Sequence, residues 1–376
     1  MNRLIKSALI LLLLAILIEF LILKSPEDPR RQDISPQEKI KSVKGNILDD
    51  EGKLIYSGFL TKPGIQWDFD ALKSKWNKRY RFKEWEFYAI HHENVTISFG
   101  IANFHYVASV FFTVYEKGSI PQYHQKLILP NEELTLAKHP LNGKTIYESG
   151  NYKVDFKNRD NKFKHLELKF DDKLELSLDV FKKTDDSMAS LTPFNSDGSN
   201  FYYTYKDYNN YISGKVTAFG KVYDFSDRIG MIDWGRGVWP YHSFWIWGSG
   251  QGKIGPNSAI GLNIGEFMFS PISKATEDCV FLDRTMYKLG NFITSYPKDL
   301  SQPWEFKTTN QHPTDEYGSA SIIFYPEIKS IFASNFWLIQ SHFDQAFGVF
   351  EGNITTRDGE ISFKARGLVE VHHTRW

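Results

Sequence analysis

The sequence has one cysteine, Cys279, in 376 residues, so it can form neither an internal disulfide nor a cluster of thiolate metal ligands. It also has no excess of charge of either sign, because 45 Lys and Arg residues balance 45 Asp and Glu residues. A neutral chain has no net field that would draw it onto nucleic acid, and we expect no nucleic-acid partner.

Motifs of several enzyme and metal-binding classes are also absent. No Gly-x-Ser-x-Gly elbow of a serine hydrolase occurs, and the stretch from Gly248 to Gly252 lacks the Lys-Ser/Thr that completes a phosphate-binding loop. The pairs His91-His92 and His372-His373 would point to opposite faces of a strand, so neither forms a chelate by itself. We therefore expect no metal site and no cofactor.

Aromatic residues are the clear excess of the composition. The chain contains 30 Phe, 19 Tyr and 10 Trp residues, which together make up 16% of the sequence. Aromatic side chains favour strands and line apolar pockets. The composition therefore suits a β-rich protein with a ligand cavity, although for any single ring filling a β core is the better explanation.

A hydrophobic segment lies near the beginning of the sequence. Residues Ala8–Leu23 are apolar except for one acid, and two basic residues precede them, which is typical of a signal sequence or signal anchor. The stretch Leu23–Pro26 is a poor signal-peptidase site. We expect residues 1–24 to form a hydrophobic helix that anchors the protein in a membrane with a single pass, with a cleaved signal peptide as the alternative. Residues 25–44, rich in Pro and charge, are expected to form a linker.

The side of the membrane is suggested by two Asn-x-Thr sequons. They begin at Asn94 and Asn353 and would fit N-glycosylation of a body outside the cytosol. We therefore expect the globular body to be lumenal or extracellular.

The remainder of the chain has the pattern of antiparallel strands. After Gly45, short runs alternate apolar and polar residues and are separated by turn residues. Residues 174–180 are one such run, and residues 361–371 continue the same period. Only Trp67–Tyr80 has helical spacing. The sequence predicts an all-β fold with one short helix, and the polar loop around residues 187–200 predicts two domains, over 45–195 and 196–376.

The segment from Asp233 to Trp247 is the densest in chemically distinctive residues. It combines four tryptophans with an acid, a guanidinium and an imidazole, and its glycines would let backbone pass close to rings or to a ligand. Upstream, Lys206 or Tyr205 could face the same cavity, and of the two places for Lys206 we favour a solvated loop end. The candidate ligand-binding residues are Trp234, Arg236, Trp239, Tyr241, His242, Trp245, Trp247 and Tyr205, and the candidate catalytic residue is Asp233.

Two interpretations of this segment remain open. In one, it lines an apolar pocket in which a buried Asp233 has a raised pKa or pairs with Arg236 or His242. Such an acid could protonate an alkene or polarise a carbonyl. In the other, Asp233 and Arg236 form a satisfied buried pair and the tryptophans close the end of a barrel.

Three blocks of the sequence resemble a known family, the domain of unknown function 2804 family. They are Gly45–Leu48, Arg81–Tyr88 and Asp233–Pro240. More distantly, the layout is similar to tandem lipocalin-like proteins that include carotenoid hydratases, tocopherol cyclases and a ceramide-handling survival factor. The resemblance implies two calycin-type antiparallel barrels in tandem and a hydrophobic lipid or isoprenoid ligand. The hydratase-like relatives have Asp-His-Trp-Gly where this chain has Asp233-Trp234-Gly235, so the resemblance extends a catalytic role to Asp233 alone.

Three functions compete on this basis. The first is a membrane-tethered, lipocalin-like protein that binds a lipid or another apolar small molecule. The second is a cofactor-free hydratase, cyclase or isomerase with Asp233 as its general acid and Arg236 or His242 tuning it. The third is a non-catalytic structural or partner-binding protein whose tryptophans only fill its core.

Overall fold

The computed structural model describes residues 37–62, 69–70, 72, 75–160, 162–182, 186–226, 228–255, 258–266, 272–310, 317–336 and 339–376. The predicted anchor over residues 1–24 lies outside the described residues, as does the linker up to residue 36. Within the described part of the chain, no helix has the length and apolar character needed to cross a membrane.

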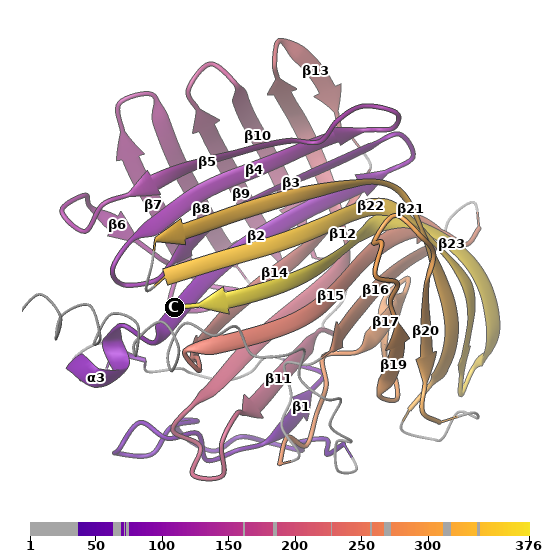
Figure 1. Ribbon diagram of the computed structural model, residues 1–376, viewed down its shortest axis with the longest axis horizontal. Helices are drawn as coiled ribbons and strands as arrows, with labels where there is room; N and C mark the ends of the chain where they lie inside the picture. The colour runs from indigo at the N-terminus through magenta and orange to yellow at the C-terminus, as the bar shows by residue number, and fades with distance from the viewer. Residues whose placement is uncertain are drawn as a thin grey trace, which may run out of the picture.

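The described chain is almost entirely antiparallel sheet, as predicted (Figure 1). A short helix, α3 (Trp76–Arg79), lies within the segment predicted to be helical. The strands form two curled sheets, each a half-barrel around its own core. The prediction of an all-β fold with one short helix is therefore confirmed.

The first sheet contains 14 strands among the residues described, in the order β5-β4-β3-β2-β14-β12-β10-β9-β8-β7-β6, with β1, β11 and β13 paired off this path. Its strands are β1 (Gly58–Leu60), β2 (Phe82–His92), β3 (Val95–Asn103), β4 (Ala108–Glu116), β5 (Gln122–Ile128), β6 (Leu134–Thr135), β7 (Gly143–Ser149), β8 (Tyr152–Asp160), β9 (Phe163–Phe170), β10 (Leu174–Phe181), β11 (Met188–Pro193), β12 (Phe201–Ala218), β13 (Lys221–Asp224) and β14 (Arg228–Val238).

The second sheet contains nine strands among the residues described, in the order β18-β17-β16-β15-β23-β22-β21-β20-β19. Its strands are β15 (His242–Lys253), β16 (Ala259–Glu266), β17 (Cys279–Leu282), β18 (Thr285–Lys288), β19 (Phe292–Ser295), β20 (Trp304–Thr308), β21 (Ser319–Phe336), β22 (Ile339–Thr356) and β23 (Gly359–Arg375). The hydrogen-bonded sheets divide between Val238 and His242. The domain boundary after residue 195 stays a prediction.

Period-two burial explains why these residues form strands. On β10 the apolar residues Leu174, Leu176, Leu178 and Val180 are buried, while Glu175 and Ser177 between them are exposed. The neighbouring strand β9 pairs in register, with Leu168 opposite Leu176 and Leu166 opposite Leu178. Apolar side chains thus meet on one face, and their burial stabilises the first core.

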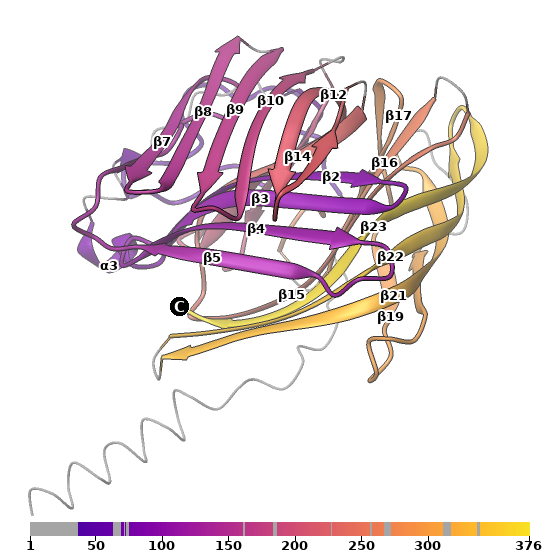
Figure 2. The same cartoon turned by 90° about the horizontal axis from the view of Figure 1, so that it is seen from above.

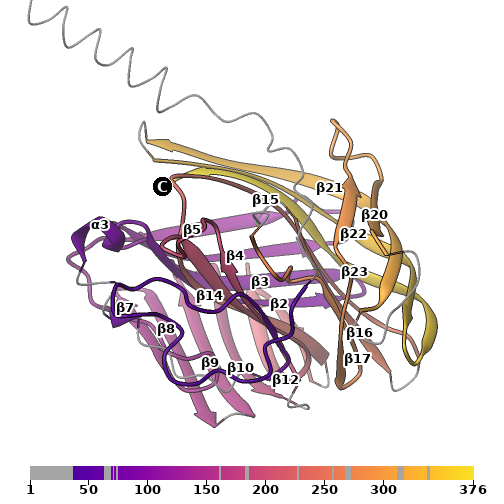
Figure 3. The same ribbon diagram turned by 90° about the horizontal axis from the view of Figure 1, so that it is seen from below.

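The central strands are buried on both faces because the two sheets pack against each other. Figures 2 and 3 show β2–β5 of the first sheet alongside β15 and β21–β23 of the second. A third apolar cluster, including Ala89, Met231, Phe347 and Leu368, fills this contact. We call the layer between β2, β12 and β14 on one side and β15, β22 and β23 on the other the seam. Residues of β14 from Gly230 onward are buried without interruption for this reason.

Candidate functional site

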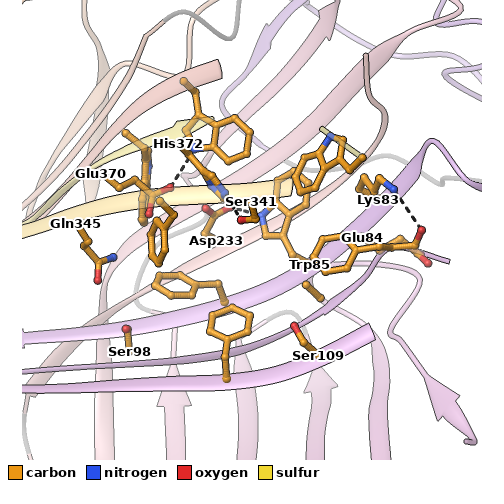
Figure 4. A pocket seen from close by; sticks show the side chains of 18 of the residues that line it. Lys83, Glu84, Trp85, Ser98, Ser109, Asp233, Ser341, Gln345, Glu370 and His372 are labelled. Atoms are coloured by element: carbon orange, nitrogen blue, oxygen red, sulfur yellow. Dashed lines mark hydrogen bonds between the residues drawn. The ribbon is translucent and has the colours of Figure 1, made fainter. Parts of the chain in front are cut away.

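One end of the seam holds a cavity of about 240 Å³. Its walls come from β2–β5, β12 and β14 of the first sheet and from β15, β22 and β23 of the second. Figure 4 shows Asp233, Glu370 and His372 near one another, with Ser98 and Ser109 on the strands across from them. The site is thus assembled from strands far apart in the sequence.

Five tryptophans give the cavity its apolar walls: Trp85, Trp239, Trp245, Trp247 and Trp376. Ring centroids lie 5.9 Å apart for Trp85 and Trp239, 5.5 Å for Trp239 and Trp245, and 5.8 Å for Trp245 and Trp376. These spacings are typical of interacting aromatic pairs. Four of the rings form a connected wall that can contact an apolar guest, and the fifth, Trp247, packs edge-on against Phe87.

Side chains alternate along β14, so the candidate residues on this strand fall into two sets, one in the first core and one lining the cavity. Trp234 lies in the first core, 5.7 Å from the Tyr203 ring, and Arg236 donates to the Ala137 carbonyl oxygen and pairs with Glu84. Asp233 lines the cavity. Because successive side chains of a strand point to opposite faces, the residues next to Asp233 in sequence are not next to it in space.

Gly235 is required by the close approach of an indole ring. It lies opposite Trp85 in the pairing of β14 with β2, and a Cβ atom on Gly235 would come within 2.0 Å of Trp85 Cζ2. The ring therefore crosses the strand over the glycine, and Trp85 Nε1 donates to Asp233 Oδ1 at 3.0 Å. The Asp-Trp-Gly sequence thus serves to hold a tryptophan against an acid.

A buried ion-pair cluster lies beside these rings. Lys206, opposite Asp233 in the pairing of β12 with β14, places Nζ 2.5 Å from Asp233 Oδ2 and 3.6 Å from Glu277 Oε2. Nζ also lies 4.8 Å from the centre of the Trp247 ring. Burial alone would lower the pKa of Lys206, but the Asp233 and Glu277 carboxylates raise it above its ordinary value. Lys206 is buried, so its expected place at a solvated loop end is wrong.

Two further carboxyl groups of the cavity have strongly shifted pKa values. Burial raises the pKa of Glu277 to about 7, against the opposing effect of Lys206. Burial likewise raises the pKa of Glu370 to about 7, although its Oε1 accepts from Trp245 Nε1 at 3.0 Å. Both groups can therefore exchange a proton near neutral pH.

A neutral histidine completes this wall. Burial lowers the pKa of His372 to about 3, and its Nε2 lies 2.8 Å from Ser341 Oγ. Among the described residues, no group of three or more His, Cys, Asp and Glu side chains could hold a metal ion.

Four of the candidate residues line the cavity, namely Asp233, Trp239, Trp245 and Trp247. Trp234, Arg236 and Tyr205 lie in the first core instead, and Tyr241 and His242 are not among the lining residues. Asp233 pairs with Lys206, whereas Arg236, which both interpretations offered as a partner of Asp233, pairs with Glu84.

Sequence reasoning named Lys206 only as the less favoured alternative, and it did not identify several other polar residues of the cavity or two of its tryptophans. Among the residues missed are Trp85, Glu277, Glu370, His372 and Trp376. The alternation over residues 361–371 did place Glu370 and His372 on one shared face, which was the available signal.

Two curled antiparallel sheets in tandem, with a tryptophan-lined cavity between them, define a lipocalin-like protein. The family described as Domain of unknown function (DUF2804) matches residues 37–376, and the chain belongs to this family. The family resemblance predicted from the three sequence blocks is therefore confirmed.

Solved structures with a similar fold include CghA with Sch210972 and kievitone hydratase from Nectria haematococca. CghA is 8% identical, with a TM-score of 0.50 over 78% of this chain and 88% of CghA. Kievitone hydratase is 12% identical, with a TM-score of 0.48 over 83% of this chain and 94% of the hydratase. No curated protein has a significantly similar sequence. At 8% identity, the likeness to CghA shows the tandem lipocalin-like fold alone.

Proposed function

We propose that this protein is a membrane-tethered, lipocalin-like binding protein whose ligand is a lipid, an isoprenoid or another apolar small molecule. The observation that carries the proposal is the cavity of about 240 Å³ with five tryptophans in its walls. Removing apolar ligand surface from water is favourable by roughly 25 cal/mol per Å². A hollow site also argues against the purely structural alternative, which requires solid packing around these rings.

The ligand is expected to carry an acceptor oxygen. Trp239 Nε1 and Trp376 Nε1 are buried and have no hydrogen-bond partner within the described part of the chain. A buried donor without an acceptor is costly, and native proteins rarely leave one unsatisfied. A carbonyl, hydroxyl or carboxyl oxygen on an apolar body would satisfy these indole groups.

Membrane tethering is the second part of this proposal and rests on the sequence of residues 8–23. We propose a single pass, with the body lumenal or extracellular. Both sequon asparagines, Asn94 and Asn353, are exposed, as glycosylation requires. Mobility shifts on glycosidase treatment would test the side of the membrane, and unmodified Asn94 and Asn353 in native protein would count against it.

Photolabelling tests the binding proposal. The full chain in lipid nanodiscs is labelled with a long-chain ketone that bears a diazirine, and the labelled peptides are identified by mass spectrometry. We expect labelling of the peptides around Trp245 and Glu370, which line the cavity. Labelling confined to residues 8–23, with none at the cavity, would contradict the proposal.

A matched pair of variants sharpens this test. Ser98 is buried and lines the cavity, so Ser98→Phe is expected to fill it and to reduce cavity labelling at least tenfold. Ser177 is an exposed residue of β10, and Ser177→Phe makes the same change of size away from the cavity. Equal labelling of the two variants would show that the probe binds elsewhere.

An acid-base enzyme is the second candidate, favoured by the raised pKa of Glu370 and Glu277 inside the cavity. Asp233 is engaged by Lys206 and Trp85, so the proton donor in this proposal becomes Glu370. Its carboxyl proton would pass to an alkene or carbonyl of the ligand, and the resulting carboxylate would recover a proton from water, as in a hydration or isomerisation.

Deuterium uptake distinguishes this candidate from simple binding. A lipid that co-purifies with the protein is incubated with it in D₂O, extracted and analysed by mass spectrometry. Deuterium in carbon-bound positions that is lost in the Glu370→Gln variant would support catalysis. Bound but unlabelled lipid would leave only the binding function.

A further inference from the structure

The opposite end of the seam holds a second cavity, of about 840 Å³, with a different chemical character. The same strands that build the tryptophan-lined cavity extend to it. Gln251 and Lys253 lie near the end of β15, Arg228 begins β14, and Arg366 lies on β23. The apolar cluster of the seam, which includes Met231 and Leu368, lies between the two ends.

Cationic side chains outnumber acidic ones in this second cavity. The cationic lining residues are Lys117, Arg228, Lys253, Lys364 and Arg366, and the acidic ones are Glu93 and Glu327. Three of the cations are already engaged within the protein, and one of these is Lys117, whose Nζ lies 3.8 Å from Glu327 Oε1. Arg366 binds both carboxylate oxygens of Glu327, at 2.8 and 3.0 Å, and Lys364 pairs with Glu351 at 2.5 Å.

Arg228 and Lys253 form no ion pair with any described carboxylate at salt-bridge distance. Both are near His92, whose pKa is lowered by burial and by the charge of Arg228, against an opposing effect of Glu93, and is lowered further by Lys253. Two cations, the Glu93 carboxylate and an imidazole therefore share one region of the cavity, and the cations are in excess. A negatively charged ligand there would relieve their mutual repulsion.

A buried amide supplies a second, independent observation. The Gln251 side chain lines this cavity with 1% of its surface exposed, and its Oε1 accepts from the His91 backbone N–H at 3.5 Å. Its Nε2 has no hydrogen-bond partner among the residues that the structure describes. A buried N–H donor of this kind requires an acceptor, and a ligand oxygen can provide one.

We propose that this end of the seam binds a phosphate group through Arg228, Lys253 and Gln251. A phosphate offers several acceptor oxygens, which suits a cavity lined by a guanidinium fork from β14 and by an ammonium and an amide N–H from β15. The cavity is larger than phosphate alone, so the group can be free or part of a lipid headgroup. The proposal does not depend on ligand binding at the tryptophan-lined cavity.

Isothermal titration with inorganic phosphate tests the site, using the full chain in nanodiscs of zwitterionic lipid at constant ionic strength set with chloride. We expect saturable binding, and at least tenfold weaker binding by the Arg228→Gln/Lys253→Gln variant. Lys144→Gln/Lys169→Gln is the matched control, because it removes the same charge from two exposed residues of the first sheet. Equal phosphate affinity of these two variants, or no binding by the unsubstituted chain, would overturn the proposal.

A second variant separates a built site from general attraction to positive charge. Gln251→Leu keeps every charge and removes the buried donor, and we expect it to weaken phosphate binding three- to tenfold. Unchanged affinity would overturn the role of Gln251 and with it the built site. Competition by soluble dihexanoyl phosphatidic acid, but not by dihexanoyl phosphatidylcholine, would identify a lipid phosphomonoester as the source. Failure of the phosphatidic acid to compete would identify free phosphate.

Discussion

The first core and the tryptophan-lined cavity both contain buried charges, but their hydrogen bonding differs. In the first core, Arg236 pairs with Glu84 at 3.0 Å, donates to three backbone carbonyl oxygens and lies 3.9 Å above the Trp234 ring. In the cavity, Lys206 faces Asp233 and Glu277, and Glu277 Oε1 has no hydrogen-bond partner within the described residues.

This difference separates a structural role from a binding role. A buried charge whose partners are all in place stabilises one conformation of the fold, and its loss is costly. Buried carboxyl groups with shifted pKa values and unsatisfied donors beside them leave capacity for a ligand. Arg236 and Asp233 lie on opposite faces of the same strand, β14. Substitutions on each face can therefore test whether the structural role and the binding role are separate.

Replacing Arg236 by Met is expected to have the largest effect on stability. The variant leaves Glu84 buried without its guanidinium partner and removes three hydrogen bonds to carbonyl oxygens. Losing one partner of a buried ion pair typically costs about 3–5 kcal/mol. Urea unfolding should show this loss, whereas Arg357→Met, at an exposed position, should change the free energy of unfolding by at most about 0.5 kcal/mol. Similar stability of both variants would contradict a structural role for Arg236.

Replacing Gly235 by Ala is expected to have an intermediate effect that acts on the cavity face. The new Cβ would clash with the Trp85 ring and displace the indole that donates to Asp233. Overpacking of this kind costs about 1–3 kcal/mol, and photolabelling of the cavity should fall as well.

Gly255→Ala is the matched control for this change. A Cβ at Gly255 would come no closer than 3.7 Å to Ser258. Neither its stability nor its cavity labelling should differ from that of the unsubstituted chain. Normal labelling of the Gly235→Ala variant would mean that the position of Trp85 does not matter for binding.

Much of the fold was predictable from the sequence because period-two burial is a local property. The alternation of residues 174–180 and 361–371 predicts strands that the structure contains as β10 and β23. These segments each present one apolar face to a core. Local pattern and tertiary environment agree there, so the sequence suffices.

The site was less predictable because its strands are buried on both faces. Trp234 and Trp239 are equally buried, at 0% and 4% exposure, yet only Trp239 lines the cavity. Hydrophobicity cannot distinguish the two environments when both exclude water. Lys206 illustrates the same difficulty, since a polar run that suggests a solvated loop is instead held by a partner from the next strand, Asp233.

Replacing Glu370 by Gln is expected to have the smallest effect, and it depends on pH. In the folded protein the pKa of Glu370 is raised to about 7 from its ordinary value of 4.5. Between these pH values the folded state retains a proton that the unfolded chain has released, so this residue destabilises the fold progressively as the pH rises toward 7. Gln cannot ionise, and the variant should be more stable than the unsubstituted chain by about 1–2 kcal/mol at pH 8.

The advantage of Glu370→Gln should vanish near pH 4, where the carboxyl group is protonated in the folded protein and largely so in the unfolded chain. Urea unfolding at several pH values between 4 and 8 measures the difference. Gln345→Glu, at a neighbouring buried position on the cavity wall, should have the opposite effect and lose stability as the pH rises. If Glu370→Gln instead lowers stability equally at every pH, Glu370 contributes through its hydrogen bond with Trp245. Glu370 would then have a structural role like that of Arg236.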